Sequence, residues 1–401
     1  MTLVKLRQHP RADGHKEVLL VAGGTAGHIM AALAVSDALL DQGLTLDQLS
    51  YLTADRSLDR ELLPESEYQV VRYKGSGITK GSSLLSRLSL VATTLRSSLA
   101  ILKPIGRWRP KVVVSFGGFY SLMGTLWAKT LGAKIVVVEQ NVVLGRANYA
   151  VSLLADKVLL AFDDTQLPMG VKRRSEVVGN PVRSEIVSLA TAPVGPRASS
   201  RERLGIQENE VVLVVTSGSL GARSINAAVA ELLRMLDLEL DRSNLTEKVK
   251  VVHFQGKTNQ VKIDMNEQLG IVEYEVRDFD PDLYLWLGAA DLVISRAGTS
   301  TLFELFALGV PAIYVPLPKS PKDHQELNAR YAKGRGAAQV VLEGDEFPRR
   351  LFDAVRELIF HAEKRKDMAA ASTQCAYLGS AKRVAEVAVA FGASAKIDRA
   401  R

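Results

Sequence analysis

Short apolar runs alternate with longer amphipathic stretches along almost the whole chain. Apolar runs without polar alternation are typical of strands buried on both faces of a parallel sheet, and the amphipathic stretches predict helices that cover the sheet. The predicted strands cover residues 17–22, 49–53, 69–73, 111–115, 134–138 and 157–160 in the first half and 211–216, 250–254, 292–295, 312–315 and 338–342 in the second. The pattern therefore predicts an α/β protein with two parallel sheets.

The pattern is interrupted at residues 191–200, a stretch rich in Pro, Gly and Ser without periodicity. This composition predicts a linker. A chain of 401 residues suits two domains, because single cores stop growing near about 250–300 residues. The expected organisation is an N-terminal domain over 1–190, a linker over 191–200, a C-terminal domain over 201–375, and a C-terminal helix and basic tail over 376–401 that is able to pack back on the first domain.

The composition, 47% hydrophobic and 24% charged, is that of a soluble globular protein. One cysteine, Cys375, excludes an internal disulfide and favours a reducing compartment. The first 17 residues lack the apolar core of a signal peptide. The most apolar long stretch, residues 18–40, carries glycines, His28 and Asp37 and is too polar for a membrane span.

Positive charge is concentrated in one segment. The 71 residues between Glu67 and Glu139 hold eleven Lys and Arg and no acid. Within it, residues 84–102 predict a helix with a stripe of leucines, which alone most often indicates core. Bases around such a stripe are typical of contact with an anionic membrane. The predicted membrane contacts are Leu84, Arg87, Leu88, Val91, Leu95, Arg96, Lys103, Arg107 and Trp108.

Nucleic acid is the alternative anionic partner for this basic segment. Only Tyr73 and Trp108 supply aromatic rings between Arg72 and Lys111. These are few for stacking on single strands, so no nucleic acid is expected.

Two glycine-rich loops follow predicted strands, Gly23-Gly-Thr-Ala-Gly-His28 in the first half and Ser217-Gly-Ser-Leu-Gly-Ala-Arg223 in the second. Glycines allow close backbone approach, and the start of a helix attracts anions. Neither loop has the dinucleotide fingerprint or the lysine of a P-loop. A tight strand-to-helix turn without any ligand is the alternative interpretation.

Polar residues also gather after two later strands. In Ser295-Arg-Ala-Gly-Thr-Ser-Thr-Leu-Phe-Glu304 the hydroxyls can cap a helix, and Glu304 suits ribose hydroxyls or merely the helix dipole. Gln325 and Asn328 lie three apart on one predicted helix face and offer amides to sugar hydroxyls. A solvated helix start is the alternative.

The segment Asp278-Phe-Asp-Pro-Asp282 twice spells Asp-x-Asp, a pattern that carries a divalent metal in some sugar-nucleotide enzymes. Here it precedes a helix expected near Leu283, so Asp280 or Asp282 is more simply a cap beside an N-terminal proline. The histidines show no paired zinc spacing. No metal is expected.

Taken together, these segments resemble the MurG family of glycosyltransferases over about residues 17–391. The segments that carry the resemblance are, in order, the first glycine loop, Ser115-Phe-Gly-Gly-Phe-Tyr-Ser121, Glu139-Gln-Asn141 with Gly145 and Asn148, Gly179-Asn-Pro-Val-Arg183, the second glycine loop, Ser295 to Glu304, and Asp323-His-Gln with Asn328-Ala. Each is weak alone, but their order and spacing are specific.

The resemblance implies a GT-B fold, with two Rossmann-like parallel-sheet domains facing across a cleft. It implies an inverting transfer of N-acetylglucosamine from UDP-N-acetylglucosamine to undecaprenyl-pyrophosphoryl-N-acetylmuramoyl-pentapeptide in peptidoglycan synthesis, without metal or other cofactor, by a peripheral protein on the cytoplasmic face of the cell membrane. The donor contacts that it implies are Thr25, Ala26, Gly27, Asn141, Arg183, Ser219, Phe279, Asp280, Thr299, Ser300, Thr301, Glu304 and Gln325, with Asn328 as a further candidate from the helix face above.

Direct displacement needs a base for the acceptor hydroxyl. His28 is the first candidate and Glu139 the second. The alternatives among enzymes are a related transferase that glycosylates diacylglycerol and a UDP-sugar epimerase on the same fold. The epimerase would interconvert UDP-sugars with no acceptor present.

Overall fold

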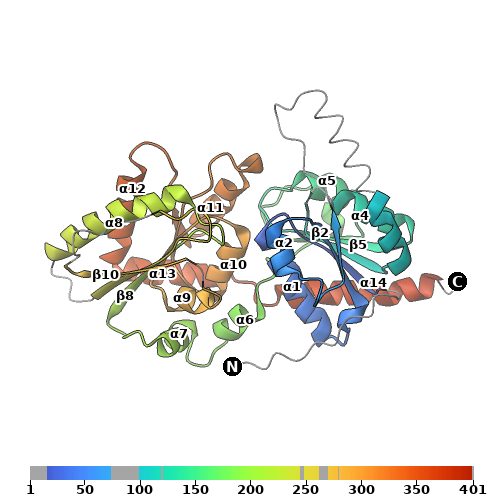
Figure 1. The fold of residues 1–401 in the computed structure, drawn as a ribbon, viewed down its shortest axis with the longest axis horizontal. Helices are drawn as coiled ribbons and strands as arrows, with labels where there is room; N and C mark the ends of the chain where they lie inside the picture. Colours follow the sequence, from blue (N-terminus) through green and yellow to red (C-terminus); the bar gives the residue numbers. More distant parts are fainter. Residues whose placement is uncertain are drawn as a thin grey trace. The chain divides into compact units, whose positions relative to one another are not determined.

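The computed structural model describes residues 16–73, 99–118, 121–243, 248–261, 270–278 and 280–399. The chain divides into unit 1, Met1–Arg183 with Gly379–Arg401, and unit 2, Ser184–Leu378. Each unit is built on one parallel sheet with helices on its faces (Figure 1). The predicted α/β class with two parallel-sheet domains is confirmed.

The sheet of unit 1 has seven strands in the order β3-β2-β1-β4-β5-β6-β7, all paired in parallel. Its strands are β1 Val18–Val21, β2 Leu49–Ala54, β3 Val70–Tyr73, β4 Val112–Ser115, β5 Lys134–Glu139, β6 Lys157–Leu160 and β7 Ser175–Val177. The helices described in this unit are α1 Ala26–Asp41, α2 Ser57–Leu62, α4 Ser121–Thr130, α5 Arg146–Ser152 and α14 Ser380–Arg399, with the short 3-10 helices Leu46–Gln48 and Lys172–Arg174. Residues 99–108 are also helical.

The sheet of unit 2 has six strands in the order β10-β9-β8-β11-β12-β13, again all parallel. Its strands are β8 Glu210–Thr216, β9 Lys248–Phe254, β10 Val272–Arg277, β11 Leu292–Ser295, β12 Ala312–Tyr314 and β13 Ala338–Val340. Its helices are α6 Ser184–Ala190, α7 Pro196–Leu204, α8 Arg223–Asp241, α9 Leu283–Ala289, α10 Thr299–Leu308, α11 His324–Gly334, α12 Phe347–Ile359 and α13 Ala362–Gln374, with the 3-10 helix Pro321–Asp323.

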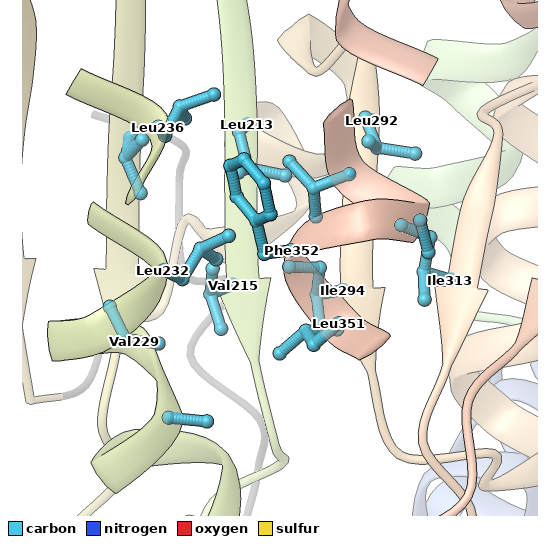
Figure 2. Packing of buried hydrophobic residues seen from close by; sticks show 14 of the residues in the cluster. Leu213, Val215, Val229, Leu232, Leu236, Leu292, Ile294, Ile313, Leu351 and Phe352 are labelled. Carbon is cyan, nitrogen blue, oxygen red and sulfur yellow. The ribbon is translucent and has the colours of Figure 1, made fainter. Parts of the chain in front are cut away.

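Burial on both faces explains the unbroken apolar strands. In β1, Val18 and Leu20 pack with α1 and α14 on one face, while Leu19 and Val21 pack on the other face with residues of the 99–108 helix. Strand β8 in unit 2 does the same, and Figure 2 shows Leu213 and Val215 beside side chains of α8 and α12. A strand that buries both faces cannot alternate apolar with polar residues, because all the polar side chains would then lie on one of its two buried faces.

Two edge strands, β7 and β10, were not predicted. Strand β10 reads Val-Glu-Tyr-Glu-Val-Arg, so polar residues alternate with apolar ones, and its burial is partial. Strand β7 is three residues long, Ser-Glu-Val, and is only half-buried. Each has one paired side and partly faces water, so neither shows the long apolar run by which the buried strands were recognised.

The crossing from unit 1 to unit 2 lies at Arg183 and Ser184, before the predicted linker at 191–200. Gly195 and Pro196, two of the residues that predicted the linker, instead begin helix α7. Gly195 is the N-cap of this helix, and Pro196 is its first residue. Arg201 then anchors α7 to unit 2, since it is 1% exposed and its Nη2 lies 2.6 Å from the Asp291 carboxylate. The boundary prediction was wrong because helix-starting and loop-forming residues are the same residue types.

The chain returns to unit 1 in helix α14, which lies along α1 (Figure 1). Val384 and Ala388 are fully buried in the same cluster as α1, and Ser380 Oγ donates to the Gly179 carbonyl at 2.9 Å. On the surface, Arg383 Nε donates to Glu176 Oε1 at 2.6 Å, and this hydrogen bond, together with the one from Lys157, lowers the pKa of Glu176 to about 2. The C-terminal segment is therefore part of the first unit's core.

Candidate active site

The glycine-rich loops lie where each sheet reverses its strand order. In unit 1 this switch falls between β1 and β4, and in unit 2 between β8 and β11. Ligands of open α/β sheets bind at the carboxyl ends of the strands at such a switch point. The first glycine loop follows β1 and the second follows β8, so both stand at the position where a ligand site is expected.

The first loop turns sharply from β1 into α1. Gly24 has φ 77°, in the left-handed region that favours glycine. Thr25 is the N-cap of α1 and its Oγ1 accepts from the His28 backbone N–H at 3.4 Å. Thr25 is exposed, and Ala26 and Gly27 are half-buried. The start of α1 therefore presents a short surface of small residues at the carboxyl end of the strands.

His28 is half-buried in the first turn of α1, and its Nδ1 lies 3.0 Å from the Gly23 carbonyl oxygen. A carbonyl only accepts, so this contact assigns the hydrogen to Nδ1. In the neutral ring the lone pair then belongs to Nε2. The loop thus orients His28 with Nε2 as its basic nitrogen.

Glu139 ends β5 and is 2% exposed. Its Oε1 accepts from the backbone N–H and the side-chain amide of Asn141, at 2.9 and 3.3 Å, and its Oε2 accepts from Gly145 N and Asn148 Nδ2, both at 2.9 Å. Burial raises the pKa of Glu139, while these four hydrogen bonds act in the opposite direction. Glu139 therefore organises the loop after β5, and the geometry favours His28 over Glu139 as a base.

Two buried amides that the sequence did not single out connect these loops. Gln140 is 3% exposed and donates from Nε2 to Asn180 Oδ1 at 2.7 Å and to the Gly27 carbonyl at 3.4 Å. Asn180 is fully buried. The structure thus brings the His28 loop beside the Glu139 loop and the segment that leads to the half-buried Arg183. Both amides lie in segments that carry the family resemblance, but only the fold shows that they contact each other.

The second glycine loop packs tightly against the loop after β9. A Cβ on Gly221 would lie 1.8 Å from the Gln255 carbonyl oxygen, so only glycine fits there. The Ser219 carbonyl accepts from Lys257 N at 2.9 Å, while Ser219 itself is half-buried. Helix α8 begins directly after this loop, and its N-cap, Ala222, makes no side-chain cap.

Helix α10 begins with Thr299, Ser300 and Thr301, and its N-cap is Gly298, which has no side chain to cap it. Thr299 is 8% exposed, and Ser300, Thr301 and Glu304 are half-buried. The first turn therefore combines hydroxyls with backbone N–H groups, and Glu304 stands one turn further on. Such a helix start suits an anion such as a diphosphate.

Asn328 and Gln325 do not share one role. Asn328 on α11 is fully buried, and its Nδ2 donates to Thr299 Oγ1 at 3.1 Å and to the Ala297 carbonyl at 3.4 Å. The prediction that Asn328 contacts a sugar hydroxyl is therefore wrong, because its amide holds the start of α10 instead. Gln325 is half-buried and its Oε1 accepts from Leu317 N at 2.9 Å, so a ligand would meet its Nε2 amide.

The Asp280 carboxylate is engaged within the protein. Its Oδ2 lies 2.6 Å from Arg277 Nη1, and its Oδ1 accepts from Asp282 N at 2.8 Å, one residue before α9 begins. Arg277 also lies over the Trp286 ring at 4.6 Å. Asp280 thus shapes the turn into α9. Phe279 lies outside the described residues.

Most of the predicted membrane contacts, Leu84, Arg87, Leu88, Val91, Leu95 and Arg96, lie outside the described residues. Lys103 and Arg107 are exposed and lie four residues apart on the 99–108 helix. Trp108 is 6% exposed and packs in the core with Ile101 and Ile105. The Trp108 prediction was wrong, because this ring is the apolar anchor of the helix.

Comparison with family models defines the class. Residues 18–160 match the glycosyltransferase family 28 N-terminal domain and residues 212–387 match its C-terminal domain. Among solved structures, MurG of Acinetobacter baumannii matches with a TM-score of 0.71 and 24% identity, over 93% of this chain and 99% of that one. The calicheamicin glycosyltransferase CalG4 matches with a TM-score of 0.61 and 16% identity, over 94% and 98%. Fold and site together define a glycosyltransferase of the GT-B class.

Curated relatives define the family more narrowly. Enzymes named UDP-N-acetylglucosamine--N-acetylmuramyl-(pentapeptide) pyrophosphoryl-undecaprenol N-acetylglucosamine transferase match from Ralstonia nicotianae, with 33% identity over 94% of this chain and 97% of the relative, and from Nitrosococcus oceani, with 34% over 92% and 97%. The chain belongs to this family, the MurG family, as its motifs predicted.

Proposed function

We propose that this protein transfers N-acetylglucosamine from UDP-N-acetylglucosamine to the muramoyl 4-hydroxyl of undecaprenyl-pyrophosphoryl-N-acetylmuramoyl-pentapeptide (lipid I), making lipid II. The observation that carries the proposal is similarity over nearly the full length of both chains to relatives that bear this activity in their names. The two helix starts that follow β8 and β11 supply chemistry that fits a nucleotide-sugar donor.

Unit 2 is proposed to hold the donor. The diphosphate would take hydrogen bonds from the backbone around Ser219 and from the first turn of α10, where Gly298 leaves the helix without a side-chain cap. Glu304, one turn into α10, would accept from the ribose hydroxyls. Asn328 supports this arrangement from behind, because it holds Thr299 in place.

Unit 1 is proposed to supply the base. The acceptor O4 attacks the anomeric carbon while the bond from that carbon to the diphosphate oxygen breaks, so the configuration inverts. His28 Nε2 takes the proton of the hydroxyl, and UDP leaves with the electron pair of the broken bond. Hydrogen bonds at the α10 start stabilise the negative charge that develops on UDP.

A radiolabel transfer assay tests this function. The full chain is incubated with labelled UDP-N-acetylglucosamine and lipid I, with and without a chelator. We expect label in the lipid fraction under both conditions, because the helix starts and loop amides would stabilise the negative charge of the diphosphate in place of a metal. Parallel incubations offer diacylglycerol in place of lipid I, or no acceptor at all. Label on diacylglycerol but not on lipid I, or an interconverted UDP-sugar without acceptor, would assign a different reaction.

We further propose that unit 1 attaches to the cytoplasmic face of the membrane, where a polyprenyl acceptor resides. In the part of the chain that the structure describes, no helix has the length and apolar character to cross a bilayer. Lys103 and Arg107 are exposed on one helix, and α5 with the residue after it exposes Tyr149 and Leu153, at 49% and 47%. Basic and apolar side chains of this kind suit reversible binding to anionic lipid.

Replacing Lys103 and Arg107 together by Gln should weaken binding to vesicles that contain phosphatidylglycerol or cardiolipin. At about 1 kcal/mol for each base, the loss is roughly 30-fold in partitioning. Sedimentation with vesicles measures it. The matched control, Arg203→Gln with Arg234→Gln, removes the same charge from exposed positions of unit 2 and should bind normally. Equal loss in both variants would mean that net charge alone drives attachment.

A further inference from the structure

The peptide unit between Gly23 and Gly24 is held from both ends by side chains. At one end, the Gly23 carbonyl lies 3.0 Å from His28 Nδ1. At the other end, the Gly24 N–H donates to Asp59 Oδ1 at 3.0 Å. The two groups belong to one planar trans peptide and point in opposite directions. Asp59 and His28 are therefore connected through a single rigid group.

Asp59 is built into the structure more firmly than a surface carboxylate. It is 1% exposed, and the same Oδ1 accepts from Thr53 Oγ1 at 2.7 Å. Thr53 is fully buried on β2, next to β1 in the sheet. An acid in the first turn of α2 would also suit the helix dipole, but a helix dipole does not require burial or contacts to two other segments. Asp59 therefore holds the backbone of the first glycine loop through the Gly24 N–H.

Arg56 also holds the turn at Gly24, by a second hydrogen bond to its backbone. Its Nη1 donates to the Gly24 carbonyl at 2.9 Å, so both the N–H and the C=O of Gly24 have side-chain partners from one short segment, residues 53–59. Arg56 is exposed, in contrast to Asp59. Gly24 has φ 77°. Glycine reaches this and many other φ values without steric cost, so its backbone alone does not fix the turn. The hydrogen bonds with Asp59 and Arg56 fix it instead.

We propose that Asp59 is a positioning residue for His28, acting through the Gly23–Gly24 peptide, with Arg56 holding the next carbonyl. Rotation of the peptide plane would break both hydrogen bonds at once. An anionic acceptor at the N–H also polarises the peptide, so that its carbonyl is a stronger acceptor for His28 Nδ1–H. This keeps Nε2 as the basic nitrogen. The consequence for turnover rests on the proposed function of His28, whereas the consequence for the ring does not.

The test compares Asp59→Ala and Asp59→Asn in the full chain. We expect Asp59→Ala to lower kcat about 10-fold to 100-fold, because the ring is misplaced. UDP affinity should change little, because Ser219, the first turn of α10 and Glu304, which are proposed to hold the diphosphate and ribose, lie in unit 2. In Asp59→Asn the amide oxygen still accepts from Gly24, so kcat should recover to within about threefold of the wild type. The nitrogen-15 shifts of the His28 ring should report the Nδ1–H form in the wild type and in Asp59→Asn, and its loss in Asp59→Ala.

Two further variants keep the result interpretable. Arg56→Ala removes an exposed side chain, so it tests the hold on Gly24 even if Asp59→Ala fails to fold, and it should shift the His28 signals in the same direction. Glu61→Ala, which removes an exposed acid from the same helix, is the matched control and should change neither reading.

An unchanged Nδ1–H form in both Asp59→Ala and Arg56→Ala would overturn the positioning role. Loss of that form supports it even if the wild type transfers nothing to lipid I, in which case the proposed function fails and the positioning role stands.

Discussion

His28→Ala should lower turnover by about 10²–10⁴-fold, the usual contribution of a positioned general base. The reason is the geometry at the start of α1, where the Gly23 carbonyl engages Nδ1 and assigns the basic lone pair to Nε2. UDP affinity should change little, because Ser219, the first turn of α10 and Glu304, which are proposed to hold the diphosphate and ribose of UDP, lie in unit 2. Steady-state kinetics with lipid I, together with calorimetric titration of UDP, measures both quantities.

A thermal unfolding curve is the control for His28→Ala. His28 is half-buried, so an unchanged midpoint with lost turnover indicates a chemical role, while a lowered midpoint with lost turnover indicates a structural one. Near-normal turnover would contradict the assignment and return the role to Glu139 or to the substrate. For comparison, Glu139→Gln should lower the midpoint, because its amide would turn N–H donors toward a site that already holds four of them.

Glu304→Ala should weaken UDP binding by about 1.5–3 kcal/mol, the value of hydrogen bonds to a charged group, or roughly 10-fold to 150-fold in Kd. Glu304 is half-buried on α10, whose apolar side is anchored by Leu302, Phe303 and Leu305, so its removal empties no core. The fold should persist. Calorimetric titration with UDP gives the change directly.

Glu326→Ala is a suitable control for Glu304→Ala. Glu326 lies on the neighbouring helix α11 and pairs with Arg330 on the surface at 2.6 Å, one helical turn away. Removing it takes away the same charge from unit 2 and should leave UDP affinity as it was. Unchanged affinity in Glu304→Ala itself would remove Glu304 from the donor site and leave α10 with its hydroxyls and backbone groups alone.

The buried strands were predictable because burial on both faces leaves a strong local signal. All eleven predicted strands are present, and β6 and β11 have the predicted bounds. The edge strands β7 and β10 were missed for the complementary reason. A strand at the edge of a sheet partly faces water, so it carries polar residues and lacks the long apolar run of a buried strand.

The candidate site was predictable in its loops and less so in its individual side chains. Glycine loops after strands, and a helix start rich in hydroxyls, are local features of the sequence. Whether a polar side chain at such a place faces a ligand or the interior depends on what packs against it. Asn328 and Trp108 show this, since each has the residue type expected for its predicted role and each is buried against a partner within its own unit.

The sequence by itself determined the α/β class, the two-unit organisation, the family and the positions of the glycine-rich loops, because each follows from patterns that span a few neighbouring residues or from the order of several motifs. Only the tertiary structure decided that Gly195 and Pro196 begin a helix, that Gln140 joins three loops, and that Asp59 and His28 share one peptide. Those facts depend on contacts between residues more than 30 positions apart, or on which face of an element is covered. Local sequence propensity does not encode long-range contacts or which face is covered, because hydrogen bonding and burial are properties of the packed chain.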